Sequence, residues 1–215
     1  MTLLKLKVCC ISSVEEAKLA TAYGADYLGL VGPMPSGPGV LSLEEVSAIT
    51  SQLNETQHSI FLSSGRTAKE IYEVFSGLGA KSIQIVRQID IDELKKLRDL
   101  LPDTELFSVV HVVGEESIAL AKEYQAYANY ILLDSGKPGS KILGGTGKTH
   151  NWDFSRRIVQ EVRIPVFLAG GLNPDNIKEA VGWVSPYGVD LCSGLRTNDR
   201  LDEKKLKHFL DQLRG

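Results

Sequence analysis

The sequence predicts an α/β protein that folds as a single (β/α)8 TIM barrel, and three observations predict it. Short runs rich in Leu, Ile and Val alternate with longer segments of helical periodicity. The alternation occurs eight times in units of roughly 25 residues, as a closed (β/α)8 barrel requires. No Pro/Ser-rich linker and no charge run interrupts it, so residues 1–215 are expected to form one domain.

The expected strands are short apolar runs that precede each helical segment. They cover residues 4–9, 27–31, 58–62, 82–86, 105–110, 129–133, 165–169 and 188–192. Strict alternation with helices implies parallel pairing through right-handed crossovers. An open doubly wound sheet is the competing architecture, but no Gly-rich dinucleotide fingerprint follows the first strand, which favours the barrel.

Capping patterns mark where several helices begin. Ser13, with Glu16 three positions later, is typical of a capping box, and Ser42 opens a second acidic first turn. Asn173 followed by Pro174 predicts a cap before a proline at the first helical position.

The composition is that of an ordinary globular chain. With 43% hydrophobic residues, 24% charged residues and a formal net charge of −3, it gives no electrostatic case for nucleic acid or an anionic membrane as main partner. No apolar stretch approaches bilayer-spanning length, and the first residues resemble a strand rather than a signal peptide. Cys9, Cys10 and Cys192 are too few and too poorly spaced to predict a disulfide framework or zinc site. A cytoplasmic location is therefore expected.

The first strand indicates which of its residues face the barrel interior. The apolar face consists of Leu4, Leu6, Val8 and Cys10, and the opposite face carries Lys5, Lys7 and Cys9. Because the apolar set is expected to pack against the helices, Cys9 is left pointing into the lumen at the carboxyl end of its strand. Barrel active sites lie at that end.

Asp134 ends the sixth strand, directly after the apolar run of NYILLDS. Partial desolvation at the barrel mouth suits a carboxyl group that acts as a general acid. Taken alone, Asp134 could simply cap the loop that follows its strand, and Cys9 could simply be a small buried apolar residue. At the same end of two strands, they are expected to form a proton-transfer pair.

Glycine turns follow the seventh and eighth strands, in FLAGGLNPDN (167–176) and VDLCSGLR (189–196). Exposed backbone N–H groups in such turns bind anions, and barrels commonly hold a phosphate at this place. Glycine also ends strands for steric reasons, but the location after these two strands favours phosphate. The candidate phosphate-binding residues are Gly170, Gly171, Ser193 and Gly194.

The stretch LGGTGKTHNW (143–152) resembles a nucleotide-binding P-loop only at its end. A Walker A loop needs a glycine five positions before the pair Gly147 and Lys148, and this chain has Ile142 there. A P-loop NTPase is therefore excluded. The four histidines have no metal-ligand spacing, although His111 near the end of the fifth strand is placed to line a pocket.

Taken together, these motifs resemble the phosphoribosylanthranilate isomerase family of tryptophan biosynthesis. The resemblance is carried by KVCCIS (7–12), GADYLGLV (24–31), LLDS (132–135), GGTGKTHNWDF (144–154), LAGGLNPDNIKEAV (168–181) and PYGVDLCSGLR (186–196). The segment GGTGKT then resembles the family's substrate-covering loop after the sixth strand.

The resemblance implies an aldose–ketose isomerase that performs an Amadori rearrangement on a small phosphorylated sugar substrate, without metal or cofactor. It implies that Asp134 protonates the furanose ring oxygen as the ring opens to a Schiff base. Cys9, as thiolate, would then remove the proton from C2. Lys7 lies on the same inward face, and we expect its charge to favour the thiolate.

Departures from the family pattern cluster at the substrate end. The loop 32–42, GPMPSGPGVLS, has no basic residue where the family usually presents an arginine that pairs with the anthranilate carboxylate. Arg87 appears after the fourth strand in place of a Gln-Leu-His-Gly-type sequence, and Arg196 stands where an acidic residue is common. The candidate substrate-binding residues are Lys7, Arg87 and Arg196.

Three functions remain open from the sequence. The chain is an isomerase of phosphoribosylanthranilate, an isomerase of the same fold acting on another phosphorylated aminoaldose, or a non-catalytic phosphosugar-binding protein. Retention of Cys9 and Asp134 argues against the third, and the related histidine-pathway isomerases are expected to carry an aspartate in place of Cys9. The pattern does not distinguish a monomer from a homodimer.

Overall fold

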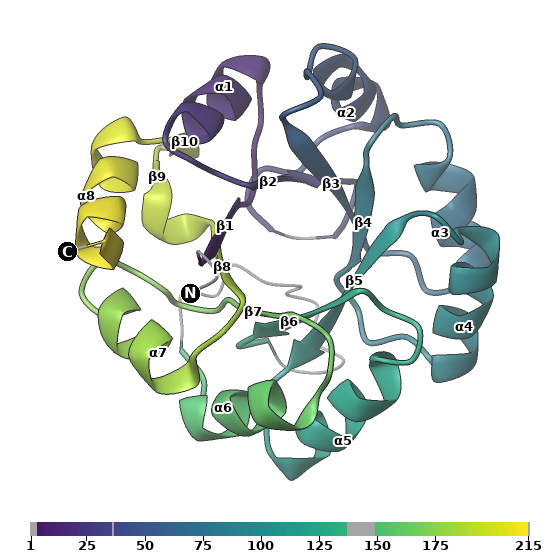
Figure 1. Ribbon diagram of the computed structural model, residues 1–215. Helices are drawn as coiled ribbons and strands as arrows, with labels where there is room; N and C mark the ends of the chain where they lie inside the picture. The colour runs from purple at the N-terminus through teal and green to yellow at the C-terminus, as the bar shows by residue number, and fades with distance from the viewer. Residues whose placement is uncertain (1–3, 36, 137–148, 215) are drawn as a thin grey trace.

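A closed eight-stranded barrel forms the centre of the computed structural model, which describes residues 4–35, 37–136 and 149–214 (Figure 1). The strands β1 to β8 follow one another in chain order, adjacent strands run parallel, and β1 pairs with β8 to close the sheet. The helices form a ring around the strands (Figure 1). This arrangement confirms the predicted (β/α)8 barrel.

The strands are Lys5–Val8 (β1), Tyr27–Val31 (β2), His58–Ser63 (β3), Ser82–Ile85 (β4), Glu105–His111 (β5), Tyr130–Asp134 (β6), Val166–Leu168 (β7) and Gly188–Leu191 (β8). The helices are Val14–Ala22 (α1), Leu43–Thr50 (α2), Ala68–Phe75 (α3), Ile91–Leu100 (α4), Glu115–Tyr124 (α5), Trp152–Glu161 (α6), Ile177–Val184 (α7) and Glu203–Arg214 (α8). Between β8 and α8 lie a short 3-10 helix, Ser193–Leu195 (η1), and a two-stranded hairpin, Arg196–Thr197 (β9) with Arg200–Leu201 (β10).

Helix starts follow the predicted caps in two of the three cases. Ser42 and Glu45 form a reciprocal capping box at α2. At α1 the Ser13 hydroxyl accepts from the backbone N–H of Glu16, as predicted, but the Glu16 carboxylate accepts from Ser12 rather than from Ser13. The predicted capping box at α1 is therefore half formed.

The predicted start of α7 is wrong by three residues. The helix begins at Ile177, and the preceding segment forms a turn in which Asn173 Oδ1 accepts from the backbone N–H of Asp175. An Asx turn of this kind satisfies a backbone N–H without a helix. The same Asn-Pro sequence is therefore compatible with a helix N-cap or with an Asx turn.

Two layers of apolar side chains hold the barrel together. The larger cluster lies between strands and helices and includes Leu6 and Val8, as the parity of β1 predicts. The smaller one fills the lumen and includes Cys9, Tyr27, Ile60, Phe107, Leu132 and Phe167. Cys10 departs from the prediction because it belongs to the lumen cluster, and its φ of 65° breaks the strand alternation just after β1 ends.

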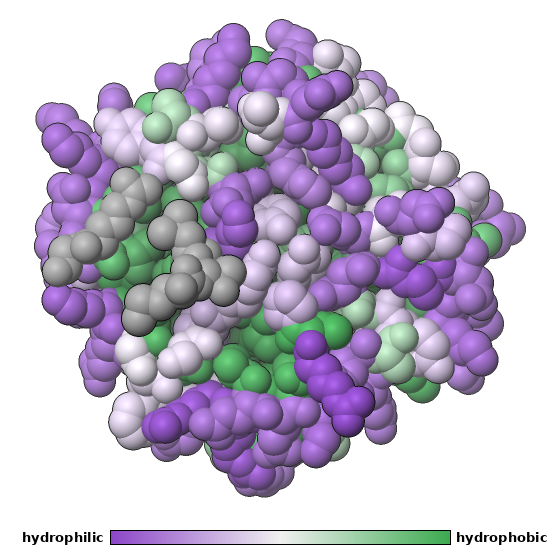
Figure 2. Space-filling view, viewed as in Figure 1, coloured by the Kyte–Doolittle hydropathy of each residue, from purple (hydrophilic) through white to green (hydrophobic). Residues whose placement is uncertain are grey.

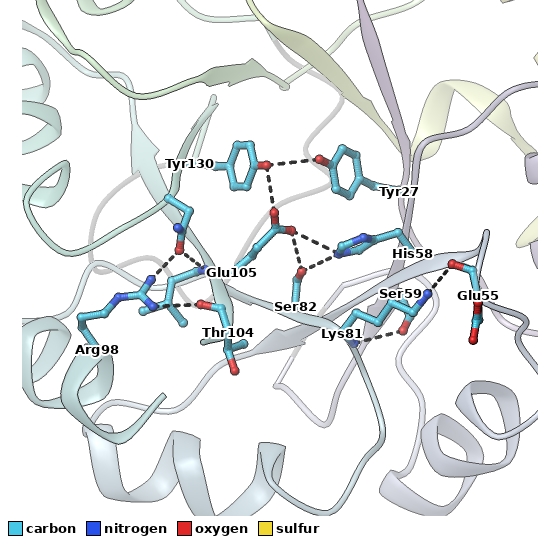
Figure 3. A network of polar contacts seen from close by, with 12 residues as sticks. Tyr27, Glu55, His58, Ser59, Lys81, Ser82, Arg98, Thr104, Glu105 and Tyr130 are labelled. Atoms are coloured by element: carbon cyan, nitrogen blue, oxygen red, sulfur yellow. Dashed lines mark hydrogen bonds and ion pairs between the residues drawn. The ribbon is translucent and has the colours of Figure 1, made fainter. Parts of the chain in front are cut away.

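Polar side chains from the first residues of five strands form one network (Figure 3). The Tyr27 and Tyr130 hydroxyls lie 3.3 Å apart, and Tyr130 donates to Glu105 Oε1 at 3.1 Å. Glu105 Oε2 accepts from the Ser82 hydroxyl at 3.0 Å and lies 3.2 Å from His58 Nε2. The network lies at the amino-terminal end of the barrel, which in this fold contributes to stability rather than catalysis.

We expect Glu105→Gln to lower the free energy of unfolding at pH 7 by about 1 kcal/mol, since its partly exposed carboxylate is screened by solvent. The hydrogen bond from His58, followed by those from Ser82 and Tyr130, holds the pKa of Glu105 below its ordinary value. A depressed folded pKa gives stability that is present above the unfolded pKa and lost as pH falls through the folded pKa. Urea unfolding at pH 7 and pH 3 measures this, with exposed Glu55→Gln as control; an equal loss at both pH values would contradict it.

The surface outside the barrel is divided by hydropathy. Figure 2 shows the molecule from the same side as Figure 1. Most residues around its outline are hydrophilic, and hydrophobic residues form patches further inside the outline. In the described part of the chain, no helix has the length and apolar character needed to cross a membrane.

Candidate active site

A pocket of about 780 Å³, counting space open to solvent, lies at the carboxyl ends of the strands. All eight strands contribute to its lining, through residues in their carboxyl-terminal halves or just beyond their ends. Of the predicted site residues, it is lined by Cys9, Asp134, Gly170, Gly171 and Ser193, and it is not lined by Gly194, Lys7, Arg87 or Arg196. The barrel therefore brings the predicted acid, the predicted base and three of the four predicted phosphate ligands to one cavity.

Cys9 is fixed at the pocket floor by strand closure. Its backbone N–H donates to Leu191 O at 2.7 Å, and its side chain is buried. A Cβ at Gly29 would lie 2.9 Å from Cys9 Sγ and 3.2 Å from Lys7 Nζ, so the thiol and the ammonium group converge above this glycine. Burial raises the pKa of Cys9 to about 11, although Lys7 opposes the rise. Lys7 thus opposes the effect of burial on this pKa, but burial outweighs it and the resting group is a thiol.

Lys7 and Asp190 form a buried ion pair beside Cys9. They are register partners on β1 and β8, with 2.9 Å between Lys7 Nζ and Asp190 Oδ2, and Lys7 has no exposed surface. Burial alone would lower the pKa of Lys7, but Asp190 and Cys9 together raise it above its ordinary value, so Lys7 stays charged. Asp190 Oδ1 is buried and has no hydrogen-bond partner among the residues described, and Asp190 lines the pocket.

Asp190 was not predicted from the sequence. The signal that would have revealed it is a single acidic residue inside the apolar run GVDLC, whose strand alternation directs it inward opposite Lys7.

Asp134 ends β6 at the pocket wall. It is half-buried, and its Oδ1 accepts from the backbone N–H of Ser135 at 2.7 Å. Its register partner on β5 is His111, which is buried, and burial lowers the pKa of this histidine. His111 is not among the pocket-lining residues, so it adjoins Asp134 without reaching the cavity.

The glycine turns after β7 and β8 pack closely against their neighbours. Gly170 and Gly171 have φ values of 81° and 66°, in the left-handed region that favours glycine. A Cβ at Gly170 would lie 2.9 Å from the backbone nitrogen of Ser135, and one at Gly194 would lie 2.9 Å from Leu172 O. The part of the pocket formed by these two turns is therefore lined by backbone, since glycine has no side chain to cover it, and it lies next to the segment that contains Asp134.

Cys10 and Cys192 form a single disulfide, whereas the number and spacing of the cysteines predict no disulfide framework. The two Cα atoms lie 6.0 Å apart although the residues are 182 positions apart in the chain. The bridge joins the segment after β1 to the segment after β8, and these strands are neighbours because the barrel closes. Chain spacing alone does not reveal a contact that closure creates. Cys9 is the free cysteine.

We expect Cys192→Ser to lower the free energy of unfolding by about 2–4 kcal/mol, because the bridge constrains most of the unfolded chain. Urea unfolding with and without a thiol reductant measures this. The reductant should destabilise the wild-type protein and leave Cys192→Ser unchanged. A reductant effect of the same size on both proteins would show that the bridge contributes nothing.

The two candidate arginines lie in different surroundings. Arg196 is buried, its Nη2 lies 3.0 Å from Glu16 Oε2, and it also donates to Cys10 O. Glu16 in turn accepts from the backbone N–H of Leu201, so Arg196 ties the β9–β10 hairpin to α1 and away from the cavity. Arg87 is half-buried, follows the pocket-lining Val86, and donates through Nε to Ser64 O at 2.9 Å.

The motif GGTGKT falls almost entirely outside the described residues, which exclude 137–148. Its interpretation as a substrate-covering loop stays a prediction. In the described segments no group of three or more His, Cys, Asp or Glu side chains is arranged to hold a metal ion.

The fold and the pocket are those of a (β/α)8-barrel enzyme. A thiol, a carboxylate and two glycine turns lie together at the carboxyl ends of the strands. Residues 6–212 match the sequence model of the N-(5'-phosphoribosyl)anthranilate (PRA) isomerase family. The chain is 31% identical to N-(5'-phosphoribosyl)anthranilate isomerase of Methanosarcina acetivorans, over 98% of this chain and 93% of that protein. It is 32% identical to the same enzyme of Methanocella arvoryzae, over 98% of both chains. The chain belongs to the N-(5'-phosphoribosyl)anthranilate isomerase family.

Solved structures show the same fold. The crystal structure of phosphoribosyl anthranilate isomerase from Thermotoga maritima has a TM-score of 0.84 and 26% identity, and the match covers 99% of this chain and 100% of that one. Another structure of such an isomerase, in complex with reduced 1-(o-carboxyphenylamino)-1-deoxyribulose 5-phosphate, has a TM-score of 0.81, 23% identity and the same coverage.

Proposed function

We propose that this protein catalyses the Amadori rearrangement of N-(5'-phosphoribosyl)anthranilate to 1-(2-carboxyphenylamino)-1-deoxyribulose 5-phosphate in tryptophan biosynthesis. One observation carries the proposal: Cys9, Asp134 and the glycine turns at Gly170 and Ser193 line the same cavity. An acid, a base and a phosphate cradle are the groups that this rearrangement needs, and family membership supports the same reaction.

The phosphate is proposed to bind between the turns after β7 and β8. Gly170, Gly171 and Ser193 line the cavity there, and Gly194 packs directly behind them against Leu172 O. Backbone N–H groups in this corner would hold the phosphate without a charged side chain. Fixing the phosphate places the ribose over the region that contains Cys9 and Asp134, which saves the entropic cost of orienting it during the reaction.

Asp134 is the proposed general acid for ring opening. As the bond between C1 and the ring oxygen breaks, Asp134 donates a proton to that oxygen and the anilino nitrogen lone pair forms an iminium bond to C1. The hydrogen bond from Ser135 N–H to Oδ1 fixes the carboxyl group, which leaves its second oxygen for the substrate. The ring oxygen leaves as a hydroxyl, and the intermediate carries one positive charge.

Cys9 is the proposed general base for the second step. It removes the proton from C2, and the electrons of that C–H bond form a double bond to C1 and neutralise the iminium. The resulting enol becomes a ketone at C2 as its hydroxyl proton is lost and C1 gains a proton, so substrate and product are isomers. Burial raises the pKa of Cys9 to about 11, so the thiol first releases its proton to solvent, and the iminium and Lys7 both favour the resulting thiolate when substrate is bound.

Asp190 is proposed to orient the sugar. Asp190 lines the cavity, and its buried Oδ1 has no hydrogen-bond partner in the described part of the chain, whereas Oδ2 is held by Lys7. A ribose hydroxyl that donates to Oδ1 would satisfy this buried acceptor.

The test is a steady-state assay on freshly generated N-(5'-phosphoribosyl)anthranilate, followed by the loss of its anthranilate-type fluorescence. Turnover that gives the ketose phosphate supports the proposal. No turnover, together with a melting temperature that still rises with inorganic phosphate, would sink it and would point to another phosphorylated aminoaldose.

We also propose that residues 1–215 act as one barrel domain, as a monomer or homodimer, in the cytoplasm. A reducing cytoplasm would hold Cys10 and Cys192 as thiols. The disulfide is then the state of the isolated, oxidised protein.

A further inference from the structure

The proposed substrate carries two anionic groups, a phosphate and the carboxylate of its aromatic ring, and this inference rests on the proposed function. The glycine turns account for the first group alone. Among the described residues that line the pocket there are two carboxylates, Asp134 and Asp190, and no lysine or arginine. A second anion would be repelled there unless a cation stands at the pocket rim.

The half of the pocket opposite the glycine turns suits an aromatic ring. It is formed by the apolar side chains of Val31, Met34, Pro38, Leu62 and Val86, together with the polar side chain of Gln84. These residues come from β2, β3, β4 and the segments that follow them. In the closed barrel β4 lies four strands from β8 in either direction, so Val86 stands across the lumen from the turn that contains Ser193. A ligand with its phosphate at the turns therefore extends its ring toward the end of β4.

Arg87 is the cation at that end. Lys7 is paired with Asp190 and Arg196 with Glu16, and the remaining arginines of the described carboxyl-end segments, at positions 66 and 200, are exposed. Arg87 directly follows Val86 and is half-buried. Its Nε is bound, but its two terminal nitrogens have no hydrogen-bond partner within the described ranges.

Ser64 fixes the arginine against the loop that lacks a basic residue. The Ser64 carbonyl accepts from Arg87 Nε at 2.9 Å, and the Ser64 hydroxyl donates to Pro33 O at 3.1 Å. Pro33 precedes Met34, which lines the pocket. One residue thus links the loop after β2, the end of β3 and the arginine after β4.

We propose that Arg87 binds the carboxylate of the substrate's aromatic ring and makes the pocket specific for carboxylated arylamines. With Nε held by Ser64, the terminal nitrogens are the free donors of a planar guanidinium, a geometry that suits a carboxylate. Arg87 takes the place of a basic residue in the loop 32–42, and Arg196 has no part in this contact.

The test combines Arg87→Met with a substrate that lacks the carboxylate, N-(5'-phosphoribosyl)aniline. On the anthranilate substrate we expect Arg87→Met to raise KM about 10- to 100-fold with little change in kcat. On the aniline substrate the variant and the wild-type protein should have the same KM. Arg66→Met, an exposed arginine two residues from Ser64, is the matched control and should behave as wild type on both substrates.

Four results separate this inference from the proposed function. Arg87→Lys, which keeps the charge and loses the planar fork, should recover part of the lost affinity if the variant folds with an unchanged melting temperature. An equal rise in KM on both substrates would show that Arg87 is structural and would overturn the inference. Wild-type turnover that Arg87→Met leaves unchanged would also overturn it, whereas absence of wild-type turnover would reject the proposed function itself.

Discussion

Asp134→Asn is expected to lower kcat by about 10²- to 10⁴-fold with little change in KM. The amide keeps the shape of the carboxyl group and still accepts the hydrogen bond from Ser135 N–H, which measures 2.7 Å in the wild-type protein. It has no acidic proton to give to the ring oxygen, so ring opening loses its general acid while binding is retained. Steady-state kinetics on N-(5'-phosphoribosyl)anthranilate measures the change.

A matched control and a partner variant sharpen that expectation. Asp103→Asn, at an exposed carboxylate, should leave kcat unchanged. Cys9→Ser should cause a loss of similar size, because a hydroxyl fills the same space but is a far weaker base at C2. An Asp134→Asn protein that keeps more than about a tenth of wild-type kcat would show that another group supplies the proton.

The second large effect concerns stability. Lys7→Met is expected to lower the free energy of unfolding by about 3–5 kcal/mol, because it leaves Asp190 buried without its charged partner. Replacing both charges in Lys7→Met/Asp190→Leu should recover most of the loss, since an apolar pair has no desolvation cost to offset. Urea unfolding of the three proteins measures both effects.

The same variant tests what Lys7 does to the Cys9 thiol, the proposed base. Lys7 lowers the pKa of Cys9 against the larger effect of burial, so its removal should raise that pKa further above about 11. Titration of the thiolate by its ultraviolet absorbance reports the change. An unshifted Cys9 pKa in Lys7→Met would sink the idea that Lys7 favours the thiolate, and a double variant as unstable as the single one would sink the explanation of the stability loss.

The features that the sequence predicted lie within single continuous stretches. Each strand end was predicted to within one residue, because the turn residues on both sides of a run of Leu, Ile and Val mark where the strand begins and ends. Cys9 and Asp134 were predicted in the same way, from their place at the ends of barrel strands, and both line the cavity. Gly170 and its neighbours were visible as a turn after β7.

The features that the sequence did not predict join the two ends of the chain. The Cys10–Cys192 bridge and the pairing of Lys7 with Asp190 each link a residue near β1 to one in or just after β8. These contacts form where the closed sheet pairs β1 with β8. The eightfold alternation predicts that closure, but it does not predict which residues of the two strands come into register. Arg196 belongs to the same group, because its partner Glu16 looks from sequence like an ordinary helix cap.

The most direct measurement is a crystal structure of this protein with reduced 1-(o-carboxyphenylamino)-1-deoxyribulose 5-phosphate, the compound bound in a solved isomerase structure. We expect the phosphate on the backbone at Gly170, Gly171 and Ser193, the carbon chain between Cys9 and Asp134, and the ring carboxylate within hydrogen-bond distance of Arg87. A phosphate bound away from the two glycine turns, or a carbon chain that contacts neither Cys9 nor Asp134, would contradict it.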